Sequence, residues 1–587
     1  MIAKNYIMKT YRLILSLFLA QLLFIACSSA EREVTIKIVQ TSDIHGNYFP
    51  FDYIKGEETS GSFARIYSYV EQQRKEHGDN LLLFENGDLL QGQPSAYYYN
   101  FIDTTSVHLA AEMMNYMKFD AANMGNHDVE AGRDVFERWA NDCDFPVLGA
   151  NIIDTTTGKP FFTPYVVFKR DGIKVAVLGM ITPAVPVWLA ENLWKGLRFE
   201  DMEETARHWL PIIREKENPD AIIGIFHAGQ NAQFLGEKYR ENASAEVAVN
   251  VPGFDVVLMG HDHTLESRKV ANVQGDSVLL LNPANLGKYV AQATLTIKKK
   301  GNNVLDKKVE GGLVAMDDYE ISARFMDKFK GEEQVVRDFV SKKIARISQT
   351  ISTRDAYFGP SAFVDLIHSL QLAISGAQIS LAAPLSFDAS INEGDITVGD
   401  MFGLYKYENM LYTMRLKGKE LKQLLEMSYA LWTNQMSSSS DQFLRLRKEE
   451  YQGKERWRFQ NSSFNFDSAA GILYTVDVTK PEGEKVTISS LADGTPFDEE
   501  AFYTVALNSY RGNGGGELIT KGAGLSKEEL QSRMVSATTK DLRYYLMEYI
   551  QQQGVITPKS LNHWKFVPEN IVEEAAKRDY DCLFGNR

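Results

Sequence analysis

The chain is predicted to be an α/β protein whose amino-terminal half is a layered α/β domain. From about residue 34 to about residue 297, short runs of Val, Ile and Leu alternate with loops and helical stretches. Runs such as "VTIKIVQ", "AIIGIF" and "VVLMG" are continuously apolar, which indicates strands that are buried on both faces of a sheet. Stretches such as "SFARIYSYVEQQRKEH" separate them and are predicted to be helices covering that sheet.

The pattern changes after this region, and 587 residues are enough for more than one domain. "DDYEISARFMDKFKGEEQVVRDFVSKKIARIS" is charged and strongly helix-forming, which predicts a helical linker at 321–350 between a first domain at 31–320 and a second at 351–587. The second domain is predicted to be α+β. Its helices include "SAFVDLIHSLQLAIS" and "KGKELKQLLEMSYALW", and its strands include "LYTMRL" and "ILYTVDV".

Residues 1–30 are predicted to be a targeting segment. Lys4, Lys9 and Arg12 precede the apolar run "LILSLFLAQLLFIA", which suits the core of a signal peptide. "FIAC" resembles a bacterial lipoprotein processing site, where Cys27 would become the lipidated first residue; the alternative is simple cleavage after "SSA". Both alternatives predict an exported protein, either periplasmic or anchored to the outer membrane through Cys27.

Charge and cysteine content limit the classes of partner and of site. The formal net charge of −14 argues against binding to nucleic-acid polymers and to anionic membrane surfaces. An anionic substrate would therefore need local cations, such as metal ions. Cys27, Cys143 and Cys582 are too few and too far apart for a disulfide framework or a thiolate metal cluster. Any metal must be held by His, Asp, Asn or Glu.

Polar side chains able to bind metal follow five of the predicted strands. They are Asp43 and His45 in "TSDIHGN", Asp88 in "NGDLLQG", Asn126 and His127 in "GNHDVE", His227 after "AIIGIF", and His261 and His263 in "GHDH". Open α/β sheets build their sites at the carboxyl ends of their strands. The pattern therefore predicts a metal centre. The remaining histidines stand outside such motifs and are predicted to be structural: His77, His108, His208, His368 and His563.

The chemistry of a phosphoryl transfer explains this choice of residues. Seven ligands, one carboxylate being shared, can hold two divalent ions about 3.5–4 Å apart. Two cations lower the pKa of a bridging water, polarise the phosphoryl oxygens and offset developing charge. His127 directly follows Asn126 and would project past the metals. That position suits stabilisation of transition-state charge or protonation of a leaving oxygen.

The motifs "DIHGN", "GD", "GNHD", "H" and "GHDH", in this order, resemble those of the calcineurin-like metallophosphoesterases. With its second domain included, the chain resembles the bacterial 5′-nucleotidase family. The resemblance implies a four-layer α/β/β/α first domain, a helical linker and an α+β substrate-binding domain. It assigns one metal to Asp43, His45, Asp88 and His263, and a second to Asp88, Asn126, His227 and His261. Zn, Mn, Fe and Co all suit this ligand set.

The resemblance also implies further site residues. In the family, the histidine matching His127 works with an acid three residues later, which is Glu130 here, but Asp128 is adjacent and the choice stays open. The second domain supplies a nucleoside pocket in which two aromatic rings clamp the base. The matching rings are Tyr407 in "GLYKYENML" and Tyr510 in "ALNSYRGNGGGEL". The latter stretch adds two candidate substrate contacts, Asn508 and Arg511.

One departure from the family pattern bears on the substrate. Where 5′-nucleotidases carry "NGG.R", this chain has "LAAPLSFDASI", and Arg354 and Arg511 are the candidates to replace the missing cation. The chain looks closer to relatives that open 2′,3′-cyclic nucleotides and then remove the 3′-phosphate. We therefore expect a monomeric cyclic-nucleotide phosphodiesterase and 3′-nucleotidase. The alternatives are a 5′-nucleotidase, a nucleotide-sugar hydrolase, a sulfur-oxyanion hydrolase and a non-catalytic nucleotide-binding surface protein.

Overall fold

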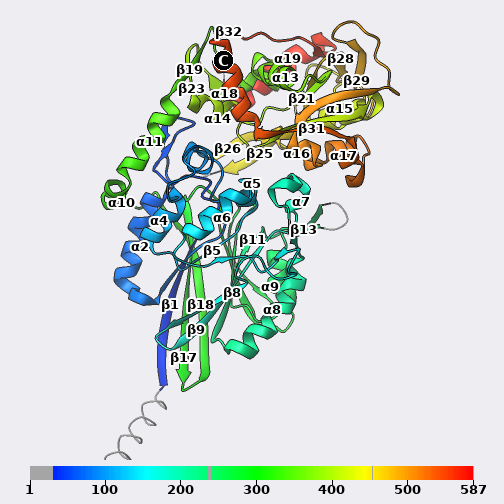
Figure 1. Ribbon diagram of the computed structural model, residues 1–587. Helices are drawn as coiled ribbons and strands as arrows, with labels where there is room; N and C mark the ends of the chain where they lie inside the picture. The colour runs from blue at the N-terminus through cyan, green and yellow to red at the C-terminus, as the bar shows by residue number, and fades with distance from the viewer. Residues whose placement is uncertain (1–30, 236–238, 452–453, 586–587) are drawn as a thin grey trace, which may run out of the picture.

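The computed structural model describes residues 31–235, 239–451 and 454–585. The chain forms two lobes that lie one above the other in Figure 1, with two helices running between them along one side. Within the described residues, no helix has the length and apolar character needed to cross a membrane. The predicted targeting segment and its Cys27 lie outside the described residues.

Two six-stranded sheets form the centre of the first lobe. The first sheet has the order β18-β17-β1-β4-β5-β6 and the second the order β15-β16-β14-β11-β9-β8. The first contains β1 (Glu31–Thr41), β4 (Leu81–Glu85), β5 (Ala121–Asn123), β6 (Val147–Leu148), β17 (Tyr289–Lys300) and β18 (Asn303–Ala315). The second contains β8 (Tyr165–Arg170), β9 (Ile173–Ile181), β11 (Ala221–His227), β14 (Val256–Met259), β15 (Leu265–Ala271) and β16 (Ser277–Pro283). Strands β1, β4, β5 and β6 are parallel, as are β9, β11, β14 and β16.

The sheets pack face to face, and helices cover their outer faces. Ile38 and Leu82 of the first sheet share one buried cluster with Val177, Ile225 and Leu258 of the second. This explains why the strands are apolar on both faces. The first sheet is covered by α2 (Phe63–His77), α4 (Leu109–Met117) and α6 (Arg133–Asp142), and the second by α8 (Met202–Glu217) and α9 (Ser244–Asn250). The predicted four-layer α/β/β/α arrangement is confirmed.

The predicted linker is only partly helical. It forms α10 (Ala323–Lys328) and α11 (Lys330–Ser341), whose residues Phe325 and Val336 pack into the core of the first lobe. The following segment forms strand β19 (Lys343–Ile347) instead of continuing the helix. It is inserted between β23 (Gly394–Thr397) and β32 (Val555–Ile556), which supply the hydrogen bonds of a sheet on both sides. The domain boundaries at 320 and 350 stay predictions.

The second lobe is α+β, as predicted. Its main sheet has the order β27-β21-β30-β24-β31. The strands are β21 (Ile379–Ala382), β24 (Met410–Lys417), β27 (Ser468–Ala470), β30 (Phe502–Asn508) and β31 (Met534–Asp541). A smaller sheet joins β28 (Ile472–Asp477) to β29 (Val486–Leu491) and β33 (Trp564–Val567). The predicted helices are α13 (Ala362–Ser375) and α15 (Gly418–Trp432), and both pack against the main sheet.

The two lobes meet at a buried aromatic contact with a cation at its centre. Tyr97 of the first lobe packs with Val398 and Phe402 of the second, at the start of α14 (Val398–Leu404). The guanidinium of Arg543 lies 4.1 Å from the ring centre of Phe402 and 5.1 Å from that of Tyr97. Tyr97 also donates a hydrogen bond of 3.3 Å to Asp541. This contact fixes one side of the space between the lobes.

Replacing Arg543 by Ala is expected to lower the free energy of unfolding strongly. Its Nη1 donates to Glu408 at 2.8 Å and its Nε donates to the carbonyl of Tyr405 at 2.9 Å, and the side chain is fully buried. Removing one partner of a buried ion pair typically costs about 3–5 kcal/mol, because the other charge stays buried without compensation. Urea unfolding followed by tryptophan fluorescence measures the change.

The matched control is Arg354→Ala, which removes an arginine from an exposed pair with Asp388. Exposed pairs contribute about 0–1 kcal/mol, so this variant should unfold close to the parent protein. Equal decreases in the free energy of unfolding of the two variants would contradict the conclusion that Arg543 stabilises the fold more than Arg354 does.

Candidate active site

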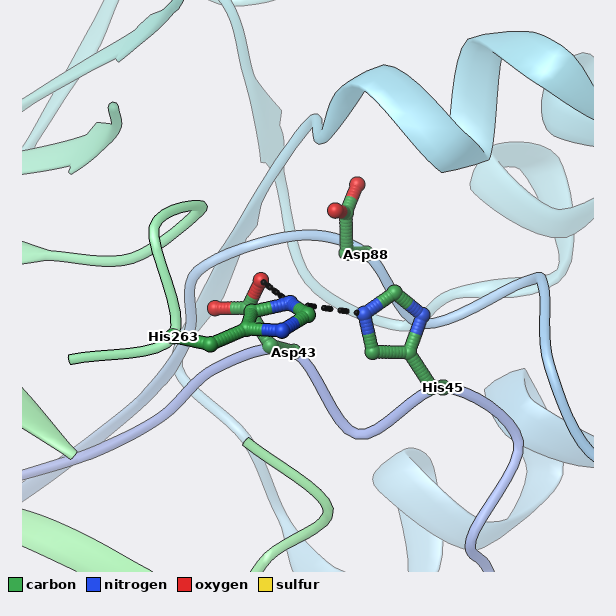
Figure 2. A group of neighbouring side chains, drawn as sticks. All are labelled: Asp43, His45, Asp88 and His263. Atoms are coloured by element: carbon green, nitrogen blue, oxygen red, sulfur yellow. Dashed lines mark hydrogen bonds and ion pairs between the residues drawn. The ribbon is translucent and has the colours of Figure 1, made fainter. Parts of the chain in front are cut away.

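The ends of parallel strands bring the predicted metal-binding residues to one edge of the two sheets. Asp43 and His45 follow β1, Asp88 follows β4, and His227 is the last residue of β11. The other three are Asn126, the first residue of α5 (Asn126–Glu130), and His261 and His263 after β14. Figure 2 shows His263 between Asp43 and His45, joined to both by dashed lines, with Asp88 beside them. Residues separated by more than 200 positions in sequence therefore share one site.

The side chains form two groups that share Asp88. In each group, the atoms that could bind a metal ion lie within 4.8 Å of one another. The first group is Asp43, His45, Asp88 and His263, and the second is Asp88, His227 and His261. In the first group, Nε2 of His263 lies 3.2 Å from Oδ1 of Asp43 and 3.1 Å from Nε2 of His45 (Figure 2). In the second, Oδ1 of Asn126 lies 3.1 Å from Nε2 of His227 and 2.8 Å from Nδ1 of His261.

The backbone at this site is strained. Five of the seven residues have a positive φ: Asp43 (52°), His45 (49°), Asp88 (56°), His261 (74°) and His263 (54°). Such a conformation costs on the order of 1–3 kcal/mol for a residue other than glycine, and it persists where the surroundings enforce it. Here the loops after β1 and β4 are bonded to each other, since the N–H of Asp43 donates to the carbonyl of Gly87 at 2.9 Å and that of His45 to the carbonyl of Asp88 at 2.9 Å.

Two glycines permit the close approach of the loops after β4 and β5. Gly87 has φ 85°, and a Cβ there would lie 2.5 Å from the nitrogen of Gly125. A Cβ on Gly125 would lie 2.2 Å from the nitrogen of Asp88. Any larger residue at either position would separate the two loops and displace the carboxylate of Asp88.

The two carboxylates beside His127 have different functions in the structure. Asp128 is completely buried, and its oxygens accept the backbone N–H groups of Gly125, Asp88, Leu89 and Leu90 at 2.8–3.0 Å. Asp128 therefore binds the two loops together, and a catalytic role for it beside His127 stays a prediction. Glu130 is the residue whose Oε2 contacts Nδ1 of His127.

Burial and neighbouring charges shift the pKa values of the side chains in the cluster. Burial, together with the charge of His263, lowers the pKa of His45 to about 3, so this imidazole is neutral. Burial alone would raise the pKa of Asp88, but His227 and His127 outweigh it and hold that pKa well below its ordinary value. Burial opposes the charged form of His127 too, yet Asp88 and Glu130 raise its pKa to about 10.

The arrangement fits divalent metal ions. Nδ1 of His45 faces the carbonyl of Gln91 at 3.2 Å, and Nδ1 of His227 faces that of Asn86 at 2.6 Å. Both rings therefore direct Nε2 into the cluster, which is how metal-binding imidazoles are held. Oδ2 of Asp88 is buried, and it lies 3.1 Å from Nε2 of His227, another atom that can bind a metal ion. A cation would satisfy that oxygen. The mixed nitrogen and oxygen donors suit Zn, Mn, Fe or Co.

A cavity of about 640 Å³ lies between the lobes and connects this cluster to the second lobe. Asn126, His127, Glu130 and His261 line its floor. The second lobe contributes three of the four substrate-contact candidates, Tyr407, Asn508 and Tyr510. The edge of Phe464 meets the ring of Tyr510, with ring centres 6.0 Å apart and planes at 88°. The structure thus brings residues of both lobes into one cavity.

The two arginine candidates have other partners. Arg511 is 2% exposed; its Nε and Nη2 donate to the two oxygens of Asp467 at 2.8 and 3.0 Å, and Nη1 donates to the carbonyl of Gly515. Through Gly515 it binds the glycine-rich stretch "GNGGG", and it does not line the cavity. Arg354 donates to both oxygens of Asp388 at 2.7 and 2.8 Å at the surface. Both guanidiniums are thus paired with carboxylates, and the expectation that either one replaces the missing cation stays a prediction.

Sequence reasoning missed several residues that line the cavity. They are Trp188 at the end of α7 (Val185–Trp188), Glu241, Phe464 and Lys521. Lys521 forms an ion pair of 2.8 Å with Glu517. None of these residues stands in a motif or follows a strand of the metal-binding pattern, so the sequence offers no signal for them. Only the folding of distant segments around one cavity identifies them.

Comparisons with known proteins agree with this architecture. Residues 36–265 match the family model of the calcineurin-like phosphoesterases, and residues 341–521 match that of the 5′-nucleotidase C-terminal domain. A 2′,3′-cyclic-nucleotide 2′-phosphodiesterase/3′-nucleotidase from Yersinia enterocolitica is 26% identical over 621 residues, covering 94% of this chain and 91% of that protein. The trifunctional nucleotide phosphoesterase protein YfkN of Bacillus subtilis is 27% identical over 614 residues; the match covers 95% of this chain but 40% of that protein.

Solved structures share the fold. The crystal structure of a 5′-nucleotidase precursor from Thermus thermophilus has a TM-score of 0.62 at 22% identity, covering 91% of this chain and 100% of that one. A Staphylococcus aureus protein crystallised with alpha-ketoglutarate has a TM-score of 0.74 at 20% identity, with coverage of 91% and 100%. The chain belongs to the calcineurin-like phosphoesterases that carry a 5′-nucleotidase C-terminal domain, and it is a phosphoric ester hydrolase.

Proposed function

We propose that this protein is an exported, monomeric, two-metal hydrolase of nucleotides that opens 2′,3′-cyclic nucleotides and removes the resulting 3′-phosphate. One observation carries the proposal: a single cavity joins the Asp and His cluster of the first lobe to the aromatic side chains of the second. The activity named for the Yersinia relative supports the choice of substrate. Export rests on the targeting pattern of residues 1–30, which also offers Cys27 for a lipid anchor.

In this proposal the metal ligands are the seven residues of the two groups that share Asp88: Asp43, His45, Asp88, Asn126, His227, His261 and His263. Two divalent ions bound there would polarise the phosphoryl group and lower the pKa of the attacking water. The two bound ions would also place positive charge at one point of a chain whose formal net charge is −14. That local charge attracts the anionic substrate.

His127 is the proposed proton donor. Glu130 contacts its Nδ1, which leaves Nε2 for the substrate, and the ring lines the cavity. The imidazolium form, favoured by Asp88 and Glu130, can stabilise charge on a phosphoryl oxygen and protonate the leaving ribose oxygen. Bound cations would offset the charge of Asp88, which is one of the groups that raise the pKa of His127.

The second lobe is proposed to hold the nucleoside. Tyr407 and Tyr510 line the cavity and are the two rings proposed to stack on the base; Phe464 lines it too and packs edge-to-face with Tyr510. Stacking on an aromatic ring contributes about 1–3 kcal/mol per base and tolerates any base. Asn508 also lines the cavity, and its Oδ1 accepts the N–H of Arg511 at 2.8 Å.

Replacing His127 by Ala is expected to lower kcat by about 10²–10⁴-fold, because general acid–base groups contribute this much. Both metals should be retained, since the proposal places His127 outside the ligand set. The kcat on 3′-AMP and the metal content by mass spectrometry are the measurements. His208→Ala, which removes an exposed histidine of α8, is the control and should change neither. Loss of a metal in His127→Ala would instead make His127 a ligand.

Replacing Tyr407 or Tyr510 by Ala is expected to raise KM for nucleotides by about 5–150-fold, the range that corresponds to the loss of one stacked base. Hydrolysis of a small aryl phosphate, which has no base to stack, should keep its KM. Tyr544→Ala, at a tyrosine with 36% exposure outside the cavity lining, serves as the control. Equal losses on both substrates would count against the base clamp.

The choice of substrate is tested by assaying 2′,3′-cyclic AMP, 3′-AMP and 5′-AMP in parallel with the metal-loaded protein lacking residues 1–30. We expect kcat/KM for the cyclic and 3′ substrates to exceed that for 5′-AMP. Chromatography follows ring opening, because that step alone releases no phosphate. A preference for 5′-AMP would support the 5′-nucleotidase alternative. Without turnover of any nucleotide, the nucleotide-sugar, sulfur-oxyanion and non-catalytic alternatives would replace the proposal.

A further inference from the structure

We propose that Glu241 is a positioning residue that fixes the imidazole of His261 so that Nδ1 faces the second metal. The inference rests on the two-metal centre of the proposed function and adds a residue that no motif indicated. Glu241 is the last residue of β13 (Tyr239–Glu241), which pairs with β12 (Gln233–Leu235) in a hairpin beside the cavity. The hairpin comes from a part of the chain between the motifs of His227 and His261.

The contacts of Glu241 show a side chain held in place at both oxygens. Oε1 lies 2.7 Å from Nε2 of His261, and Oε2 accepts a hydrogen bond of 3.0 Å from the side-chain amide of Gln233. Glu241 is 9% exposed, so water competes little for these oxygens. Trp188 lies on the ring of His261, with ring centres 5.5 Å apart and planes at 34°. The imidazole therefore has a carboxylate at its edge and an indole over its face.

This geometry decides which nitrogen of His261 can bind a cation. An ionised carboxylate only accepts hydrogen bonds, so the proton of a neutral imidazole lies on Nε2, toward Glu241. Nδ1 then carries the free lone pair. That atom is 2.8 Å from Oδ1 of Asn126, the other proposed ligand of the second metal. The carboxylate–histidine pair thus orients the ring and makes Nδ1 a stronger donor.

His261 differs in this respect from His227, the other histidine of its group. His227 directs Nδ1 to the backbone carbonyl of Asn86 and offers Nε2 to the cluster, and His45 does the same with the carbonyl of Gln91. His261 is reversed: it offers Nδ1, and a side chain holds its Nε2. A backbone carbonyl cannot be removed by mutation, whereas a side chain can. Replacing Glu241 therefore removes the partner of one metal-binding histidine, His261, and leaves the partners of the other two unchanged.

The experiment compares Glu241→Gln and Glu241→Ala with the parent protein, each prepared without residues 1–30 and free of metal. Mn²⁺ is titrated into each, and calorimetry gives the number of ions bound and their affinities. In both variants we expect one of the two ions to bind about 10–100-fold more weakly while the other is unchanged, as is usual when the partner of a metal-binding histidine is lost. The kcat on 3′-AMP should recover when excess Mn²⁺ is supplied, because the positioning residue does not contact the substrate.

The control is Glu246→Gln, at a half-exposed carboxylate of α9 that pairs with Arg240 at 3.1 Å. It should bind both ions as the parent does. If Glu241→Ala fails to fold, the isosteric Glu241→Gln decides. Unchanged affinities for both ions in Glu241→Gln would overturn the inference and leave the proposed function standing. A parent protein that binds fewer than two ions would contradict the two-metal centre itself.

Discussion

The buried carboxylate of Asp128 is the interaction on which the site depends. Its two oxygens accept four backbone N–H groups from the loops after β4 and β5. These bonds hold the loops at a separation that only Gly87 and Gly125 permit, and they fix the position of Asp88. Without such bonds, a loop carrying a non-glycine residue at φ 56° would relax to a conformation of lower energy. The backbone hydrogen bonds to Asp128 therefore keep the ligand loops in their strained conformation.

The second constraint is the joining of two lobes around a cavity. Arg543 lies between the rings of Phe402 and Tyr97, one from each lobe, and its guanidinium binds Glu408 at 2.8 Å. Glu408 directly follows Tyr407, so the contact that joins the lobes also positions an aromatic side chain of the cavity. Packing between the lobes and the geometry of the cavity are thus set by neighbouring residues of one segment.

The sequence was informative where a residue type and its place in a strand pattern pointed to the same chemistry. Asp43, Asp88 and His227 each follow or end an apolar run, and parallel strands bring such positions to one edge. The sequence alone leaves the choice between Asp128 and Glu130 open, although residues three apart share a helix face, which puts Glu130 beside His127. Other features had no local signal. Arg511 depends on Asp467, which lies 44 residues earlier, and β19 is a strand because β23 and β32 flank it.

The positions of the arginines bear on how a phosphate ester would be oriented. Among the described residues that line the cavity, Lys521 is the one Lys or Arg, and it is paired with Glu517. Arg511 and Arg354 are committed to Asp467 and Asp388. In the proposed function, positive charge for the phosphoryl group comes from the first lobe, from His127 and the ions that the cluster suits. The aromatic side chains of the second lobe would then hold the nucleoside. We infer that the distance between these two anchors discriminates among phosphate positions on the ribose, since the described part of the second lobe places no arginine in the cavity lining to do so.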